Sequence, residues 1–178
     1  MRYRRVYIEG GSYFFTVVTE KRRNLFADAD NIERLRTAFK TVMQKRPFVI
    51  DAAVVLPDHL HFVWTLPEHD SDYSTRWRLI KTAFTKQYPQ PFTVYNANRI
   101  KKKQHDLWQH RGWEHCLRDE RDFQQHIDYI HYNPVKHGFV KRASDCRYSS
   151  IHRFIKSGIL NMDWGGEDLA FADVIGYE

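Results

Sequence analysis

Two segments rich in β-branched and aromatic residues stand almost end to end near the middle of the chain, and they constrain the fold more than any other feature. Residues 48–56 (FVIDAAVVL) and 60–66 (LHFVWTL) both have the composition of β-strands. Pro57 and Asp58 between them are typical of a tight turn. The sequence therefore predicts an antiparallel hairpin.

The remaining segments alternate between strand and helix patterns. Strands are predicted at 12–19 and 112–117, and apolar residues at helical spacing predict helices at about 30–46, 74–88 and 119–133. Asp30 and Ser74 are the expected N-caps of the first two helices, and Pro134 is the expected end of the third. Residues 89–104 are polar and are expected to form a loop.

The order strand, helix, strand, strand, helix, strand, helix predicts an α+β fold. We expect a ferredoxin-like or RRM-like antiparallel β-sheet with helices packed on one face, plus an extra C-terminal helix and tail. Residues 1–142 are expected to form the functional domain, and residues 143–178 a tail with a candidate regulatory role. Many RNA-binding modules share this architecture, so the fold alone does not decide the function.

Composition narrows the class of protein. Lys and Arg number 28 against 22 Asp and Glu, a net charge of +6, and aromatics make up 15% of the chain. A basic, aromatic-rich domain favours nucleic acid as a partner. No apolar run approaches the ~20 residues of a membrane span, and no GxxxxGK[ST] or GxGxxG motif indicates a nucleotide cofactor. Cys116 and Cys146 lack CxxC spacing, so a reducing cytoplasm is expected.

A His-x-His pair stands at the start of the third predicted strand. Side chains alternate along a strand, so His59 and His61 share one face. Leu60, Phe62 and Trp64 share the opposite face, which is the expected core side. The two imidazoles are then close enough to bind one metal ion, although a pair of surface histidines without a ligand has the same pattern.

The third predicted helix carries a polar stripe beside its apolar one. Asp122, His126, Tyr129 and Asn133 follow the spacing of one helix face, next to the core positions. A tyrosine hydroxyl, with a pKa near 10, is a poor nucleophile unless a metal polarises its target. Two histidines and an amide oxygen suit Mg²⁺ or Mn²⁺ better than a closed structural zinc site. The alternative for Tyr129 is a structural tyrosine at the edge of the core, with no catalytic role.

The ordered motifs of the chain resemble one known family. The resemblance rests mainly on VVLPDHLHFVWTLPE, WxxRGWEH and DYIHYNPVKHG, and also on YRRVYIEGGSYFFTV, RPF, SxRWRxIK, NPVKHGFV and DWGG. The chain resembles the REP-associated tyrosine transposases, which are members of the HUH single-strand endonucleases. The resemblance extends over nearly the whole chain. It implies the same α+β fold, with an HUH-type catalytic domain at 1–142.

The resemblance also assigns roles to residues. It implies that His59 and His61 bind the metal, that Asn133 helps to hold it, and that Tyr129 is the nucleophile. Many relatives have Gln in place of Asn133. The implied cofactor is Mg²⁺ or Mn²⁺, and the implied substrate is single-stranded DNA next to short palindromic (REP) hairpins. Cleavage would proceed through a 5′-phosphotyrosine that a 3′-OH can attack, so that strands rejoin without ATP.

Other expectations follow from this reading. His126 is a candidate proton shuttle or orienting partner of Tyr129. The protein is expected at the nucleoid, and a monomer is favoured, although some tyrosine transposases pair and exchange the tyrosine helix. DNA binding is expected from basic groups on phosphates and an aromatic under a base: Arg4, Arg5, Arg22, Arg23, Lys101, Lys102, Lys103, Arg111, Trp113, Lys136 and His137.

Two other functions fit the residues considered on their own. One is a non-catalytic module that binds single-stranded nucleic acid, in which the histidines are incidental. The other is a zinc hydrolase, in which His110 or His115 joins His59 and His61 as a third ligand. Metal-dependent cleavage distinguishes the first from a transposase, and stoichiometric zinc distinguishes the second.

Overall fold

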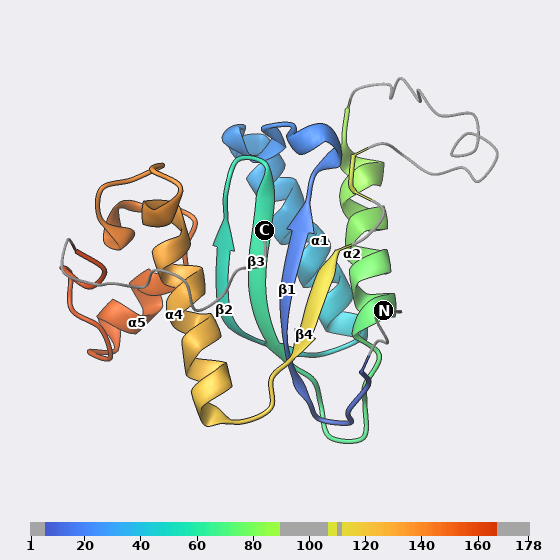
Figure 1. Ribbon diagram of the computed structural model, residues 1–178. Coiled ribbons are helices and arrows are strands. Elements are labelled where there is room, and N and C mark those ends of the chain that lie inside the picture. Colours follow the sequence, from blue (N-terminus) through green and yellow to red (C-terminus); the bar gives the residue numbers. More distant parts are fainter. Residues whose placement is uncertain (1–5, 90–106, 110–111, 167–178) are drawn as a thin grey trace.

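The computed structural model describes residues 6–89, 107–109 and 112–166 (Figure 1). Its centre is a four-stranded antiparallel sheet in the order β2–β3–β1–β4. The strands are β1 (Ser12–Val18), β2 (Val49–Val55), β3 (His59–Thr65) and β4 (Trp113–Cys116). The helices are α1 (Ala29–Lys45), α2 (Tyr73–Gln87), α4 (Glu120–Lys136) and α5 (Ile151–Lys156), and the 3-10 turns are η1 (Glu20–Arg22), η2 (Leu25–Ala27) and η3 (Ala143–Asp145). The predicted α+β fold and its hairpin are confirmed.

The main core lies between the sheet and helices α1 and α2. The β3 side chains that were expected to face the core do so: Trp64 stacks on Trp77 of α2 at 4.4 Å, and Phe62 stacks on Phe39 of α1 at 4.8 Å between ring centroids. Phe15 of β1 extends the same cluster. The alternation of β3 therefore fixes which face carries His59 and His61, which is the face opposite this core.

Helix α4 covers the other face of the sheet. Its Ile127 and Ile130 pack with Phe14, Val54 and Val63, which come from three different strands. Figure 1 shows α1 behind the sheet and α4 beside β2. The sequence predicted helices on one face only. The second face is also covered because these three strand residues make it apolar enough to bury a helix.

The N-caps of α1 and α2 and the C-terminal end of α4 differ from the prediction. The N-cap of α1 is Asp28, whose side chain accepts from the N–H of Asp30, and the N-cap of α2 is Asp72. Helix α4 begins as predicted, after Asp119, but it continues through Pro134 to Lys136. A proline removes one hydrogen bond, and the turn closes where the N–H of His137 donates to the carbonyl of Asn133. Within the described residues, no helix is long and apolar enough to cross a bilayer.

The segment after Arg142 packs on both β2 and α4. The N–H of Val55 donates to the carbonyl of Tyr148, and the N–H of Ser150 donates to the carbonyl of Ala53. Ser150 Oγ also lies 2.9 Å from the Ala53 nitrogen and 2.9 Å from His131 Nε2. Burial lowers the pKa of His131 to about 4, so this histidine is neutral in the interior. The division of function at residue 142 stays a prediction.

Candidate active site

His59 and His61 lie side by side on β3 and face helix α4. Their ring centroids are 4.9 Å apart. The two residues are 3% and 0% exposed, so they are interior groups and not a chance pair on the surface. The register of the sheet places Thr16 of β1 and Val54 of β2 on either side of His61.

The orientation of His59 is set by the residue before it. Asp58 Oδ1 lies 2.6 Å from His59 Nδ1, and Asp58 Oδ2 lies 3.1 Å from Arg22 Nη1. Burial lowers the pKa of His59 and outweighs the opposing effect of Asp58, which favours the neutral imidazole that a metal needs. Since Nδ1 donates to the carboxylate, the lone pair of His59 is on Nε2. This buried atom has no hydrogen-bond partner among the described residues.

His61 is held by a neighbouring strand. Thr16 Oγ1 lies 2.9 Å from His61 Nδ1. In both histidines a side chain engages Nδ1, so Nε2 is the atom that each ring can offer to a metal. A protein partner on the far nitrogen is the usual way in which metal-binding imidazoles are oriented. The residues present therefore fit a metal site.

Tyr129 of α4 lies next to this pair. Its ring centroid is 5.4 Å from that of His61 and 5.8 Å from that of Phe14, both in edge-on geometry. Lys136 Nζ lies 5.2 Å from the Tyr129 ring centroid. Asn133, one turn after Tyr129, is fully buried in the same helix. Residues some seventy positions apart in the chain thus meet at one place.

His137, at the C-terminal end of α4, also reaches the histidine pair. Its ring centroid is 5.4 Å from that of His59, and its positive charge, when present, contributes to lowering the pKa of His59. His137 was predicted as a DNA-binding residue. Its position beside a predicted metal ligand adds a contact that the sequence did not indicate.

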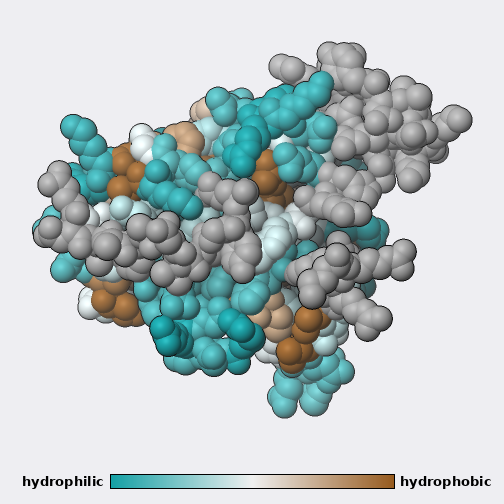
Figure 2. Space-filling model, in the orientation of Figure 1, coloured by the Kyte–Doolittle hydropathy of each residue, from teal (hydrophilic) through white to brown (hydrophobic). Residues whose placement is uncertain are grey.

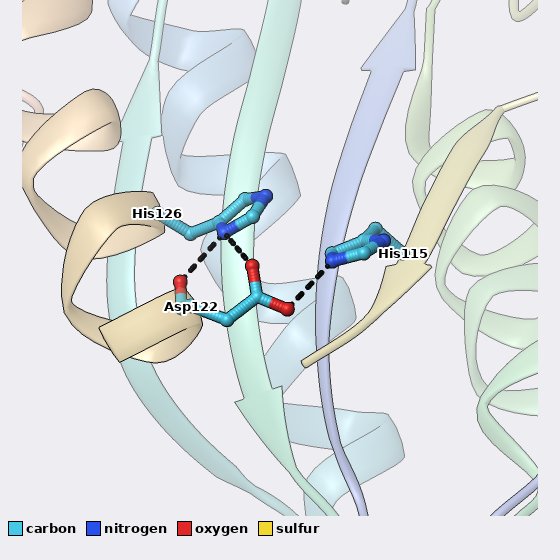
Figure 3. Close-up of side chains that lie close together, drawn as sticks. All are labelled: His115, Asp122 and His126. Carbon is cyan, nitrogen blue, oxygen red and sulfur yellow. Dashed lines mark hydrogen bonds and ion pairs between the residues drawn. The ribbon is translucent and has the colours of Figure 1, made fainter. Parts of the chain in front are cut away.

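His126 belongs to a second polar group, shown in Figure 3. Its Nδ1 lies 2.7 Å from the Asp122 carbonyl oxygen and 3.2 Å from Asp122 Oδ1, and His115 Nε2 lies 2.9 Å from Asp122 Oδ2. Burial alone would raise the pKa of Asp122. Hydrogen bonds from His115 and Arg118 outweigh it and hold that pKa at about 2. Asp122 is therefore ionised at neutral pH, and burial lowers the pKa of His126.

Within the described residues, no third ligand of the zinc-hydrolase alternative is found beside His59 and His61. In the part of the chain that the structure describes, one group of three such residues has its ligand atoms within 4.8 Å of one another, namely His115, Asp122 and His126. His115 is thus engaged with Asp122 on β4 and α4. His110 lies outside the described residues.

Five of the predicted DNA-binding residues lie in the part of the chain that the structure describes, and Lys136 and His137 are two of them. Arg22 is about half exposed and binds Asp58, Arg23 Nε donates to the Glu20 carbonyl, and Trp113 stacks on His115 with ring centroids 5.7 Å apart. Figure 2 shows a largely hydrophilic face with separate hydrophobic patches. The remaining candidates lie outside the described residues: Arg4, Arg5, Lys101, Lys102, Lys103 and Arg111.

Sequence reasoning missed several supporting residues. Asp58 was noted only as part of a turn, although a carboxylate directly before a predicted metal ligand is a usable signal. Thr16 could be found only from the strand register. The ring of Phe14 contacts His61, Tyr129 and His126. In the sequence, nothing distinguishes Phe14 from the other aromatic residues of the core.

Comparison with known proteins gives the family. Residues 8–133 match the family described as Transposase IS200 like. The REP-associated tyrosine transposase of Escherichia coli K12 is 44% identical over 170 residues, which cover 96% of this chain and 94% of that protein. A Haemophilus influenzae protein is also 44% identical, over 164 residues that cover 92% of this chain and 93% of its own.

A solved structure supports the same assignment at the level of the fold. It shows a REP-associated tyrosine transposase bound to a REP hairpin, with a TM-score of 0.78 and 42% sequence identity. The match covers 97% of this chain and 95% of the other. The protein described here therefore belongs to the REP-associated tyrosine transposases, within the IS200-like transposase family.

Proposed function

We propose that this protein cuts and rejoins single-stranded DNA beside short palindromic hairpins, with Tyr129 as the nucleophile. The observation that carries the proposal is the contact between Tyr129 and His61, whose ring centroids are 5.4 Å apart, with His59 directly beside His61. The solved relative that is bound to a REP hairpin supports the substrate class. A protein that acts on chromosomal DNA would be located at the nucleoid, in the cytoplasm.

In this proposal, His59, His61 and Asn133 would hold Mg²⁺ or Mn²⁺, which would supply positive charge that stabilises the scissile phosphate. The buried Nε2 of His59 supports this assignment, since a lone pair without a hydrogen-bond partner in the interior is costly unless a ligand binds it. Imidazole nitrogens and an amide oxygen are acceptable donors for either ion.

The strand-transfer chemistry is a transesterification. The Tyr129 phenol gives up its proton, and its oxygen bonds to phosphorus while the bond from phosphorus to the 3′ oxygen breaks. The 3′ oxygen takes up a proton and leaves as a 3′-OH, and the 5′ end stays on the protein as a phosphotyrosine. The ester keeps the energy of the broken bond, so attack by a 3′-OH restores a phosphodiester without a nucleotide cofactor.

The contacts of His126 favour the orienting role over that of a proton shuttle. Its Nδ1 is engaged by Asp122, and its ring packs on Phe14 with centroids 4.8 Å apart. Phe14 in turn packs on Tyr129. His126 therefore supports the surface on which Tyr129 lies.

DNA binding in this proposal uses the basic residues around Tyr129 and His59. Lys136 lies beside Tyr129, His137 lies beside His59, and Arg22 binds Asp58, the residue before His59. Arg23 and Trp113 belong to the same proposed set. Arg4, Arg5, Lys101, Lys102, Lys103 and Arg111 complete the proposed set. Because Tyr129 meets His61 of its own chain, a monomer carries the proposed site without a second copy.

The test is formation of a covalent adduct. The protein is incubated with an oligonucleotide that carries a palindromic hairpin and its flanking single strand, with Mn²⁺, and the product is resolved on a denaturing gel and identified by mass spectrometry. We expect an adduct with the native sequence and with Tyr132→Phe, the matched control on the same helix, and none with Tyr129→Phe or with EDTA. An adduct on Tyr129→Phe contradicts the proposal. Binding without cleavage would favour a binding module, and stoichiometric zinc would favour a hydrolase.

A further inference from the structure

The carboxylate of Asp122, in the first turn of α4, binds residues of β4 and of the connection between β4 and α4. Its Oδ2 accepts from His115 of β4 at 2.9 Å, and from both the backbone N–H and the Nε of Arg118 at 3.1 Å each, in the connection between β4 and α4. The backbone N–H of Asp122 donates to Asp119, the N-cap of α4, at 2.8 Å. Only 6% of Asp122 is exposed. We call His115, Arg118, Asp122 and His126 the Asp122 cluster. Figure 3 shows His115, Asp122 and His126 of this cluster.

The Asp122 cluster fastens the start of α4 to the sheet. Hydrogen bonds to an ionised acceptor are roughly twice as strong as neutral ones, and here they join a strand, a connecting segment and the first turn of a helix. The His115 ring also stacks on that of His126, with centroids 4.9 Å apart and 19° between the planes. Sliding α4 along the sheet would break these contacts together.

The cluster is linked to the proposed nucleophile through one aromatic ring. Phe14 packs on His126 at 4.8 Å, on His61 at 5.5 Å and on Tyr129 at 5.8 Å between ring centroids. It is fully buried in β1, one of the two inner strands of the sheet. Phe14 therefore contacts both the Asp122 cluster, through His126, and the Tyr129–His61 pair.

The same residue types would also suit a metal ion, but their contacts oppose one. Asp122 Oδ2 already accepts from three N–H groups, one of which belongs to the Arg118 guanidinium. His126 Nδ1 is committed to a backbone carbonyl oxygen 2.7 Å away, which leaves the buried Nε2 as the one ring atom that a cation could use. A cation in this position would have to displace those donors and stand beside a positive charge.

We propose that Asp122 is a positioning residue for Tyr129, because it fixes the first turn of α4 to β4 and, through His126 and Phe14, sets the tyrosine against His61. The inference rests on the proposed function, in which Tyr129 attacks DNA. Reaction rates are sensitive to displacements of about an ångström in such a pair, so loosening the helix slows the chemical step more than it weakens DNA binding.

The experiment compares Asp122→Asn with Asp70→Asn. Asp70 binds the buried Arg76 through two contacts of 3.0 and 2.7 Å on the opposite side of the sheet, so its loss destabilises the fold without touching α4. Single-turnover adduct formation is measured at saturating hairpin DNA and Mn²⁺, well below the melting temperature of both variants, and the DNA dissociation constant is measured separately. His115→Gln, which removes the ring that stacks on His126 at a partly exposed site, is the second variant if Asp122→Asn does not fold.

We expect Asp122→Asn to slow adduct formation at least tenfold, His115→Gln to slow it less, and Asp70→Asn to leave it within twofold of the native rate, with DNA affinity within twofold throughout. An equal rate in Asp122→Asn and Asp70→Asn overturns the positioning role. So does a metal ion that survives dialysis in the native protein and is lost in Asp122→Asn. If the native protein forms no adduct, the proposed function itself fails, a result distinct from the first two.

Discussion

The carboxylate of Asp58 lies 2.6 Å from Nδ1 of His59, the residue that follows it in the chain. The pair stands at the turn into β3, so one short segment supplies both the predicted metal ligand and the group that orients it. Burial favours a raised pKa for Asp58, but the hydrogen bonds from His59 and Arg22 outweigh burial and lower that pKa.

Replacing Asp58 by Asn is therefore expected to weaken metal binding. Loss of an orienting carboxylate typically reduces metal affinity by about 10- to 100-fold. Titration of the DNA-free protein with Mn²⁺ by calorimetry measures this directly. Arg22→Ala is the matched control, because it removes the contact to Asp58 Oδ2 and keeps the bond to His59. Equal Mn²⁺ affinity in Asp58→Asn and the native protein would disprove the orienting role.

Lys136 provides a test of the proposed DNA surface. Its Nζ lies 5.2 Å from the Tyr129 ring centroid, so a phosphate brought to Tyr129 also comes close to Lys136. Lys136→Gln is expected to weaken binding and to reduce the slope of log affinity against log salt by about 1. Fluorescence anisotropy at several salt concentrations measures the slope. Lys40→Gln, on α1 across the sheet, should leave it unchanged, and a loss of slope there as well would argue against a localised contact.

Ser150 joins the C-terminal segment to the sheet and to α4. Its Oγ accepts from the Ala53 N–H and bonds His131 Nε2, both at 2.9 Å. Ser150→Ala leaves these buried groups unsatisfied and is expected to lower the free energy of unfolding by about 1–3 kcal/mol. Urea denaturation measures the loss as a lower midpoint with unchanged slope. Ser157→Ala should cost much less, because the Ser157 hydroxyl donates to the Phe154 carbonyl at an exposed position.

The pKa of Asp122 predicts how stability depends on acid. The folded pKa of about 2 lies below the usual 3.8, so the unfolded chain binds the proton more readily. The ionised carboxylate contributes about 2 kcal/mol of stability, at about 1.4 kcal/mol per pKa unit. This contribution is complete above about pH 5, is about half lost at pH 3, is mostly lost at pH 2 and disappears near pH 1.

The measurement is the difference in unfolding free energy between the native protein and Asp122→Asn, obtained from urea melts at pH 6 and pH 3. The difference should shrink as the pH falls. A difference that is the same at both pH values would show that the charge of Asp122 does not stabilise the fold.

The hairpin and the face of the histidines could be predicted because both depend on short-range patterns. A turn between two apolar segments forces antiparallel pairing, and the alternation of Leu60, Phe62 and Trp64 assigns the opposite face to His59 and His61. The meeting of Tyr129 with His61 was expected from the family resemblance and not from periodicity, which places a side chain on a helix face but does not locate its partner.

The position of α4 could not be predicted, because periodicity does not say which face of a sheet a helix covers. Phe14, Val54 and Val63 form the second apolar face only once three strands are aligned. The contact of Thr16 with His61 also depends on strand register. The end of α4 was predicted too early, because a proline in the last turn removes a single hydrogen bond and the next N–H groups still find acceptors.

The C-terminal segment also affects the tendency of this protein to aggregate at high concentration. Strand β2 is at the edge of the sheet, and an edge with open N–H and C=O groups recruits strands from other molecules. Here Tyr148 and Ser150 occupy such groups on Val55 and Ala53, and the Arg153 guanidinium binds the carbonyls of Ile50 and Asp51. Along this edge the protein already supplies the strand-like partner that another copy would otherwise provide, which protects it from edge-to-edge aggregation.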